Sequence, residues 1–276
     1  MLDTETTESL IRRALDEDLG GGHDITTQNI IPADHKTTAV IRARKPGVLA
    51  GISLAEKTFS LLSNEISFKR HAGDSDILKA GQDILTIEGP TQSILIGERT
   101  ALNFLTHLSG IATLTYAYVQ AVKGTNAKIL DTRKTVPGLR SLQKYAVAMG
   151  GGANHRMGLY DAVLIKDNHI AAAGSIGKAL DAVKNCDSIE IEVDTLFQLQ
   201  EVLDHGGAHI VLLDNMDIPT LKKAVQIAAG KIKLEASGGV TLETVRAIAE
   251  TGVDYISVGA LTHSAPALDI GMDIDV

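Results

Sequence analysis

The chain has 276 residues, of which 44% are hydrophobic but only 3% aromatic, and its formal net charge of -8 argues against a general nucleic-acid-binding or anionic-membrane surface. This length suits one large domain or two moderate ones, and without Trp the core must be aliphatic, as in helices packed on parallel strands. The single Cys186 excludes an internal disulfide and a Cys-based zinc site. The sequence shows no signal peptide and no apolar run of the ~18 residues that a membrane helix needs. We therefore expect a cytoplasmic protein.

The first ninety residues predict a small domain with an antiparallel sheet. Helices are expected at residues 7–19 and 53–62, and extended, alternating stretches at residues 37–43, 65–70 and 82–88. Glycines punctuate the region, and the run that begins at Gly20 ends the first helix. Strands mixed with helices in this order are typical of an α+β domain.

The pattern changes near residue 91. Apolar side chains from Ile94 to Leu108 predict a long, mostly buried helix. Gly110 is expected to break this helix, with a second helix running to about Val122. We therefore place a domain boundary here, with one domain at residues 1–110 and the next at residues 111–265.

From Lys128 onward, apolar strands alternate with amphipathic helices. The strands are predicted at residues 128–131, 162–166, 188–193, 209–214, 231–236 and 254–258, and the helices at residues 139–149, 174–184, 196–203, 218–229 and 242–250. This alternation predicts a parallel sheet built from βα units. Six units in succession without an obvious reversal favour a closed βα barrel over an open doubly wound sheet.

Each predicted strand ends in polar residues, and in a barrel these ends meet at one mouth, the usual site of chemistry. The cationic donors at these ends are Arg133, Lys134, His155, Arg156 and Lys166. Residues 131–170 carry six Lys or Arg against three Asp or Glu, although the whole chain is acidic. Guanidinium and ammonium groups suit carboxylates and phosphates, so the mouth is predicted to bind an anion.

Two strand ends contain glycine and could bind phosphate. Ser237-Gly238-Gly239 precedes a helix predicted to begin near Leu242, and Gly259-Ala260 follows the last strand. A strand-to-helix turn of this kind exposes backbone N–H groups to an anion. An ordinary βα turn is the competing interpretation, because short glycine motifs are weak signals.

Glu192 and Asp214 end neighbouring strands. Two carboxylates beside a phosphate site suit Mg²⁺, bound directly or through water or substrate oxygens. They could instead bind ribose hydroxyls, stabilise a developing cation, or form salt bridges to Lys134 and Lys166; the sequence leaves these alternatives open.

Three glycines at residues 150–152 precede His155 and Arg156. They allow a mobile loop that brings both side chains over the mouth. The alternative for His155 is a loop histidine with a structural hydrogen bond.

Taken together and in order, these motifs resemble the quinolinate phosphoribosyltransferase family over nearly the whole chain. The motifs that carry the resemblance lie at residues 97–103, 131–140, 154–156, 164–169, 190–193, 212–216, 235–239 and 258–263. The resemblance implies an α/β fold with an N-terminal α/β sandwich domain and a C-terminal, incomplete, seven-stranded α/β barrel, with residues 266–276 packing back on the first domain. It also implies a homodimer, or an assembly of dimers, in which active sites are shared and Arg99 reaches into the site of the neighbouring subunit.

The family's reaction would transfer a phosphoribosyl group from phosphoribosyl pyrophosphate to quinolinate with loss of CO₂, giving nicotinate mononucleotide for NAD synthesis. By the same resemblance, the two carboxylates of quinolinate would meet Arg99, Arg133, His155, Arg156 and Lys166. Phosphoribosyl pyrophosphate with Mg²⁺ would lie between Lys134, Glu192, Asp214 and the loops at Ser237, Gly238 and Gly239 and at Gly259 and Ala260. The expected catalytic residues are Lys134, Lys166, Glu192 and Asp214, and no organic cofactor is implied.

Three other functions compete with this one. A Schiff-base aldolase of the same fold would use Lys134 or Lys166 as its nucleophilic amine, although a cluster of cations suits a multiply anionic substrate better. A paralogue with this fold could serve another acidic heterocycle, as in genes placed beside molybdate transporters. A non-catalytic protein that binds phosphorylated metabolites would bind without turnover.

Overall fold

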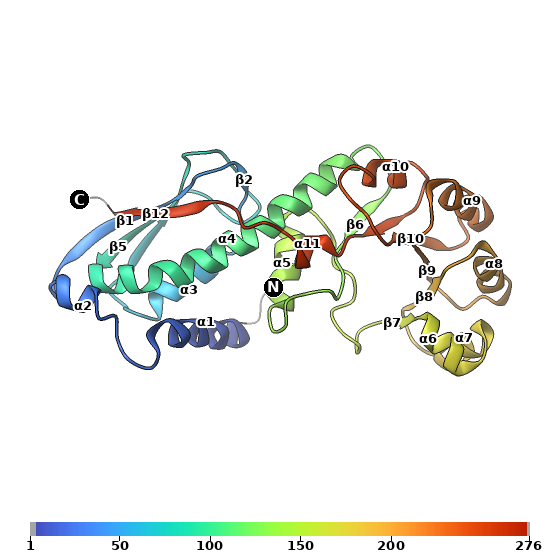
Figure 1. Cartoon of the computed structure of the whole chain (residues 1–276), viewed down its shortest axis with the longest axis horizontal. Helices are drawn as coiled ribbons and strands as arrows, with labels where there is room; N and C mark the ends of the chain where they lie inside the picture. The colour runs from blue at the N-terminus through green and yellow to red at the C-terminus, as the bar shows by residue number, and fades with distance from the viewer. Residues whose placement is uncertain (1–3, 275–276) are drawn as a thin grey trace. The chain divides into compact units, whose positions relative to one another are not determined.

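The computed structural model describes residues 4–274, which form two compact units. Unit 1 contains the residues up to Leu114, together with Ser141–Gly151 and the residues from Ala265 onward. Unit 2 contains Thr115–Arg140 and Gly152–Ser264. Figure 1 labels the elements of both units in chain order. The domain boundary predicted at residue 110 stays a prediction.

A four-stranded antiparallel sheet forms the centre of unit 1. Its strand order is β12 (Ile270–Ile274), β1 (Lys36–Ala43), β5 (Asp83–Pro90) and β3 (Ser67–Arg70). The alternation in β1 places Ala39, Ile41 and Ala43 on the buried face, as a period of two requires. A separate pair, β2 (Gly47–Val48) and β4 (Ile77–Leu78), is too short to give a recognisable pattern in the sequence.

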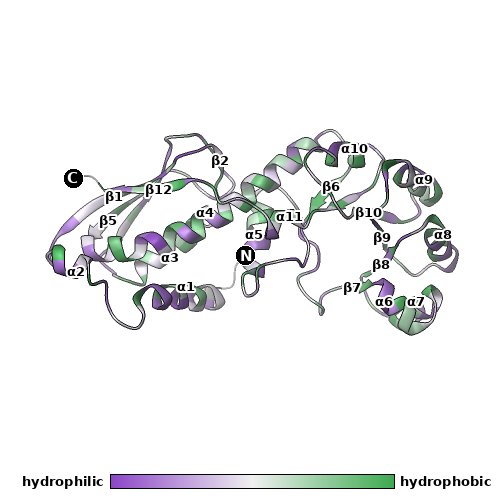
Figure 2. Ribbon diagram, viewed as in Figure 1, coloured by the Kyte–Doolittle hydropathy of each residue, from purple (hydrophilic) through white to green (hydrophobic). Residues whose placement is uncertain are grey.

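The helices of unit 1 are α1 (Thr4–Leu19), α2 (Thr27–Ile30), α3 (Ile52–Ser60), most of α4 (Thr91–Ala121) and nearly all of α5 (Arg140–Met149). Phe59 of α3 and Ile94 and Leu105 of α4 are fully buried in one core cluster with strand residues such as Ile41 and Ile87. In Figure 2, α1 is hydrophilic along much of its length, with hydrophobic turns between. The predicted antiparallel sheet and its two early helices are confirmed.

Gly110 does not break α4, and the prediction of two helices was wrong. The helix runs without interruption from Thr91 to Ala121 (Figure 1). A Cβ atom on Gly110 would lie 2.1 Å from the carbonyl oxygen of Pro266, so a side chain there would collide with the backbone. The glycine therefore allows a close approach between two segments of unit 1, which a single sequence does not reveal.

β12 adds the chain's last described strand to the sheet of unit 1. It pairs antiparallel with β1, with Ala43 opposite Ile270 and Ala39 opposite Ile274. Asp273 also accepts hydrogen bonds from Arg42 at 3.2 Å and Arg44 at 2.6 Å. No sequence pattern predicted this strand, although the resemblance implied that residues 266–276 pack back on the first domain.

Unit 2 is built on a sheet of six parallel strands. The order is β6 (Lys128–Leu130), β11 (Tyr255–Ser257), β10 (Lys233–Ser237), β9 (Ile210–Asp214), β8 (Ile189–Val193) and β7 (Val163–Ile165). All six predicted strands are confirmed, and the order follows the chain from β7 to β11 before returning to β6, as in a barrel. Ala153 forms a single parallel bridge with Leu130, in the place of the seventh strand that the resemblance implied. The barrel is therefore incomplete between this bridge and β7.

Helices follow the strands of unit 2; the predicted helices at residues 174–184, 196–203, 218–229 and 242–250 are confirmed, whereas the short helices at residues 167–173 and 260–263 were not predicted. The helices of this unit are α6 (Asp167–Ala173), α7 (Ile176–Val183), α8 (Leu196–His205), α9 (Ile218–Ala228), α10 (Val245–Ala249) and α11 (Ala260–His263). Side-chain caps start three of them. Ser175, Thr195 and Asp217 accept hydrogen bonds from the backbone N–H groups three residues further on, those of Lys178, Gln198 and Thr220. Among the described residues, no helix is long and apolar enough to cross a membrane.

Candidate active site

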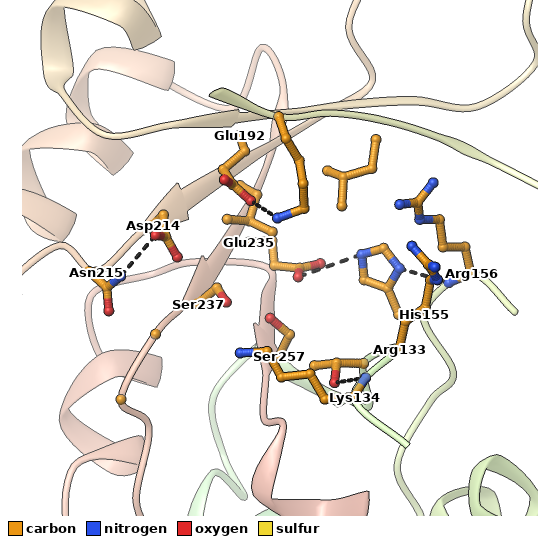
Figure 3. A pocket seen from close by; sticks show the side chains of 16 residues that line it. Arg133, Lys134, His155, Arg156, Glu192, Asp214, Asn215, Glu235, Ser237 and Ser257 are labelled. Carbon is orange, nitrogen blue, oxygen red and sulfur yellow. Dashed lines mark hydrogen bonds and ion pairs between the residues drawn. The ribbon is translucent and has the colours of Figure 1, made fainter. Parts of the chain in front are cut away.

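A cavity of ≈ 430 Å³ lies at the carboxyl ends of the strands of unit 2 (Figure 3). All of the residues that line it belong to this unit. Ten of the predicted site residues are among them: Arg133, Lys134, His155, Arg156, Lys166, Glu192, Asp214, Ser237, Gly238 and Gly239. Six others were not predicted as site residues: Thr132, Leu164, Leu212, Asn215, Glu235 and Ser257.

The other three predicted residues lie elsewhere. Gly259 and Ala260 begin α11, next to Lys134: a Cβ atom on Gly259 would lie 3.3 Å from Lys134 Cδ. Thr262 of the same helix donates a hydrogen bond to the carbonyl of Lys134 at 2.7 Å. Arg99 is exposed on α4, in unit 1. The binding roles of all three stay predictions.

Asp131, at the end of β6, fixes the segment that carries His155. Its side chain is fully buried and accepts hydrogen bonds from Asn154 Nδ2 at 2.6 Å and from the backbone N–H of His155 at 2.9 Å. The bridge between Ala153 and Leu130 ties the same segment to the sheet. The structure therefore gives this segment fixed partners, whereas the three glycines before it had suggested a mobile loop.

Arg133 and Arg156 bring two neighbouring, half-buried positive charges to the cavity. The Nε atoms of both are buried and have no hydrogen-bond partner among residues 4–274. Arg156 Nη1 donates a hydrogen bond to the carbonyl of Ala162 at 3.1 Å. Burial lowers the pKa of Arg156, and the neighbouring charge of Arg133 lowers it further. Two such guanidinium groups favour an anionic ligand with several acceptor oxygens.

His155 makes a hydrogen bond with each ring nitrogen. Nδ1 accepts from the backbone N–H of Arg156 at 2.7 Å, and Nε2 lies 2.9 Å from Glu190 Oε2. Because Nδ1 acts as an acceptor, the proton of the imidazole sits on Nε2 and is donated to Glu190. His155 is thus a neutral donor within a buried cluster in this structure, whereas the sequence suggested a cation. Its contact with substrate stays a prediction.

Glu190 and Glu235 complete this cluster on the inner side of the barrel. They are 4% and 1% exposed, and Glu235 Oε1 lies 3.7 Å from His155 Nε2. Burial, followed by the charge of Glu190, raises the pKa of Glu235 to about 7. One signal was present in the sequence: β8 reads Ile-Glu-Ile-Glu-Val, and this alternation places Glu190 on the same inner face as Glu192.

The same three residues resemble a metal-binding group. One ligand atom each from His155, Glu190 and Glu235 lies within 4.8 Å of the others. However, Nε2 of the histidine carries the proton for the reason given above, so it has no lone pair for a metal. This geometry favours a hydrogen-bonded cluster over a metal centre.

The two carboxylates considered for Mg²⁺ lie on neighbouring strands. Glu192 accepts from Lys166 Nζ at 2.6 Å, which is one of the salt bridges that the sequence left open. Asp214 accepts from Asn215 Nδ2 at 2.8 Å. Each carboxylate has a second oxygen, and two hard oxygen donors beside an anion site fit a magnesium ion that also takes substrate and water oxygens.

The glycine loop after β10 is locked to the end of β9. Asn215 has a left-handed backbone (φ 52°), and its N–H donates to the carbonyl of Ser237 at 2.9 Å. A Cβ atom on Gly238 (φ 96°) would lie 2.0 Å from Asn215 Oδ1, so only glycine fits. The helix that follows begins at Val245, later than the predicted start near Leu242. Phosphate binding here would therefore use N–H groups of the loop and not a helix end.

The chain is similar to known proteins over nearly its whole length. Residues 24–109 match the family model described as "Quinolinate phosphoribosyl transferase, N-terminal domain", and residues 111–273 match the one for the C-terminal domain. The chain is 48% identical over 280 residues to "Nicotinate-nucleotide pyrophosphorylase [carboxylating]" of Mycobacterium leprae, with 98% of each chain covered. It is 45% identical over 262 residues to the "Probable nicotinate-nucleotide pyrophosphorylase [carboxylating]" of Bacillus subtilis, covering 94% of this chain and 90% of the relative.

Solved structures give the same result. The fold matches the crystal structure of NadC from Streptococcus pyogenes with a TM-score of 0.95 and 39% identity, covering 100% of this chain and 98% of that one. This likeness extends over the α/β sandwich part as well as the incomplete barrel, so the predicted fold class is confirmed.

Proposed function

The chain belongs to the quinolinate phosphoribosyltransferase family, and from this premise we propose that the cavity of unit 2 is where it acts on its substrates. The enzyme is a phosphoribosyltransferase of NAD biosynthesis: it transfers a phosphoribosyl group from phosphoribosyl pyrophosphate to quinolinate. The products are nicotinate mononucleotide, pyrophosphate and CO₂. Quinolinate is a pyridine with two adjacent carboxylates, so its site must supply several cationic donors.

The pair of half-buried guanidinium groups is the observation that carries this assignment. Arg133 and Arg156 each have an Nε atom that is buried without a partner in the described chain, and both line the cavity. A dicarboxylate would satisfy these donors and neutralise the two charges. We propose that quinolinate lies on this side, with Lys166 and His155 completing the contacts.

The opposite part of the cavity suits phosphoribosyl pyrophosphate. Lys134 would bind the pyrophosphate, and the loop of Ser237, Gly238 and Gly239 would donate backbone N–H groups, with Gly259 and Ala260 nearby. Glu192 and Asp214 would hold Mg²⁺, either directly or through water. When bound there, Mg²⁺ would neutralise the negative charge of the departing pyrophosphate.

The side chains then have separate tasks in the reaction. Pyrophosphate leaves C1 of the ribose through a state with oxocarbenium character, whose positive charge Glu192 and Asp214 favour. Lys134 stabilises the charge on the leaving group. The ring nitrogen of quinolinate bonds to C1 and becomes cationic, so it stabilises the electron pair that stays on C2 when the carboxylate there leaves as CO₂.

Dimer formation and location are also proposals. We propose a homodimer, or an assembly of dimers, in which Arg99 of one subunit completes the quinolinate site of the other, because Arg99 is exposed on α4 and belongs to unit 1. A cytoplasmic location is proposed because the single Cys186 is free and exposed.

A direct assay tests the function. Purified protein with Mg²⁺, quinolinate and phosphoribosyl pyrophosphate is expected to release CO₂ and form nicotinate mononucleotide. If neither product forms, the assignment fails. Borohydride trapping with carbonyl substrates tests the aldolase alternative, in which Lys134 or Lys166 is the nucleophile and Lys166 would have to leave its ion pair with Glu192.

A further inference from the structure

Glu235 is a buried acid in the cavity with no part in the steps described so far. It extends from β10, is 1% exposed, and neither carboxyl oxygen has a hydrogen-bond partner in the described part of the chain. Figure 3 shows its carboxyl group directed toward His155, with Glu192 and Asp214 on one side of it and Arg133 and Arg156 beyond the imidazole. The acid therefore lies between the part of the cavity assigned to phosphoribosyl pyrophosphate and the part assigned to quinolinate.

The neighbours of Glu235 favour its uncharged form. Glu190 approaches from β8, His155 from the segment after the bridge, and Ser257 from β11, the strand paired with β10. Burial and then the charge of Glu190 raise the pKa of Glu235, and they outweigh His155 and Ser257, which act in the opposite direction. Charged groups elsewhere in the cavity are Arg133, Lys134, Arg156, Lys166, Glu192 and Asp214. A buried carboxyl beside a carboxylate keeps its proton up to neutral pH, in agreement with the raised pKa of Glu235.

The reaction itself needs a proton at this place. When CO₂ leaves, the ring carbon keeps the electron pair of the broken bond, and the product carries hydrogen at that carbon. Provided that the proposed function holds, we propose that Glu235 donates this proton to the ring carbon that loses CO₂. A neutral acid inside the cavity can do this without a water molecule entering next to the reacting ring carbon.

The step balances as a simple proton transfer. The bond between C2 and its carboxylate breaks, and the electron pair remains on C2 beside the cationic ring nitrogen. The O–H bond of Glu235 breaks and a C2–H bond forms. Glu235 is left as a carboxylate, the pyridinium keeps its positive charge, and solvent returns the proton to Glu235 after the product leaves.

Two lysines are the competing donors. Lys166 lines the same cavity but is held by Glu192 at 2.6 Å, and Lys134 is placed on the pyrophosphate side. Both are ammonium groups that could also release a proton. Their removal would weaken substrate binding as well, whereas replacing Glu235 by Gln keeps the shape of the side chain and removes only the proton.

Single-turnover measurements on the Glu235→Gln enzyme test the proposal. Quinolinate, phosphoribosyl pyrophosphate and Mg²⁺ are mixed with excess enzyme, and pyrophosphate and CO₂ are followed separately. We expect pyrophosphate release to stay within about threefold of the wild-type rate, while CO₂ release falls by about 100-fold, the scale of losing a general acid. The nucleotide that still carries both carboxylates should accumulate. A parallel fall of both products, or CO₂ release at the wild-type rate, would overturn the role of Glu235.

A second variant and the pH profile separate proton donation from a structural role. Glu235→Asp keeps an acid and should recover part of the CO₂ release that Glu235→Gln loses. The wild-type rate of CO₂ release should fall as pH rises above about 7, because the acid loses its proton, and the Glu235→Gln rate should be flat there. Equal pH profiles would contradict the proposal. If the wild-type enzyme makes no nicotinate mononucleotide, the proposed function fails as well; if only the variants behave unexpectedly, the function stands.

Discussion

Individual side chains at the cavity are held to different degrees. Lys166 is tied to Glu192, whereas the exposed Lys134 is positioned through its backbone: its N–H donates to Thr132 Oγ1 at 3.0 Å, and its carbonyl accepts from Thr262. The ammonium group of Lys134 can therefore move to meet a phosphate while the backbone stays fixed. Such a group contributes mainly when charge develops on the leaving group.

For Lys134→Ala we expect a loss of at least ~2.7 kcal/mol in transition-state stabilisation, or about 100-fold in kcat/KM, on the scale of losing one charge-stabilising donor. Steady-state kinetics with both substrates measures this. Lys128→Ala is the matched control, because Lys128 is exposed in β6 and does not line the cavity. An unchanged kcat/KM for Lys134→Ala would remove this residue from the site.

Glu235 also makes the stability of the fold depend on pH. Its pKa in the folded protein is about 7, against 4.5 when it is exposed, so the folded state binds the extra proton between these values. The contribution of Glu235 to the free energy of unfolding is therefore fully present below pH 4.5, and it is lost as the pH rises through about 7. We expect Glu235→Gln to raise the free energy of unfolding at pH 8 by roughly 1–3 kcal/mol, since each pKa unit corresponds to about 1.4 kcal/mol.

Urea unfolding at pH 5.5 and pH 8 measures this effect. The difference between the two pH values should be smaller for Glu235→Gln than for the wild type. Glu192→Gln is a useful comparison, because Glu192 is paired with Lys166 and should lose stability when neutralised. Identical pH dependence of the wild type and Glu235→Gln would show that Glu235 is ionised in the native protein.

The sequence indicated which residues line the cavity but not how they pair. Polar residues directly after aliphatic strands revealed Arg133, Lys166 and Asp214, because the ends of parallel strands meet at one edge. The cluster of His155 and Glu190 depends on the register between β6, β8 and β10, which no local pattern contains. This is why His155 was expected to be a cation.

Among the elements, α4 contains a glycine that the sequence pattern wrongly indicated as a helix break. Gly110 lies inside a helix of 31 residues and is there because Pro266 passes within 2.1 Å of the position a Cβ atom would take. In an unobstructed helix, Gly→Ala would stabilise by about 1 kcal/mol. At Gly110 the clash with the carbonyl oxygen of Pro266 should make the same change destabilising.

We expect Gly110→Ala to lower the free energy of unfolding by about 1–3 kcal/mol, the usual cost of overpacking. Denaturant unfolding gives the value. Gln120→Ala serves as the control, because Gln120 is exposed in the last turn of the same helix and should change stability by less than about 0.5 kcal/mol. If Gly110→Ala stabilises the protein, the segment at Pro266 can move away from the helix at little energetic cost.

Other elements escaped prediction for reasons of size and burial. α6 has no buried residue, so its seven residues show no apolar stripe. β2 and β4 have two residues each, which is too short for a period of two to be visible. The barrel strands were found because their interior positions are continuous aliphatic runs, and their pairing followed from chain order.

For the whole molecule, shared active sites can be tested with mixed subunits. Arg99→Ala and Lys134→Ala should each be nearly inactive alone. If Arg99 completes the partner's site, half of the randomly mixed dimers contain one intact site, and activity should recover to about a quarter of the wild-type value. Mixing Lys134→Ala with Asp214→Ala is the control, because both changes lie in unit 2 and no dimer regains a complete site. If activity does not recover with Arg99→Ala, then Arg99 acts in the active site of its own subunit or lies outside the active site.

The pairing of β12 with β1 has a consequence for how the chain is made. Arg42 and Asp273, which hydrogen-bond between these strands, are 231 positions apart, and all of unit 2 is translated between them. Because domains tend to fold as they leave the ribosome, the barrel can form before the sheet of unit 1 is complete. Until then, the backbone hydrogen-bonding groups along the edge of β1 have no strand partner. The growing chain would expose that edge until β12 emerges, so nascent-chain aggregation, and the help of a chaperone against it, should centre on β1.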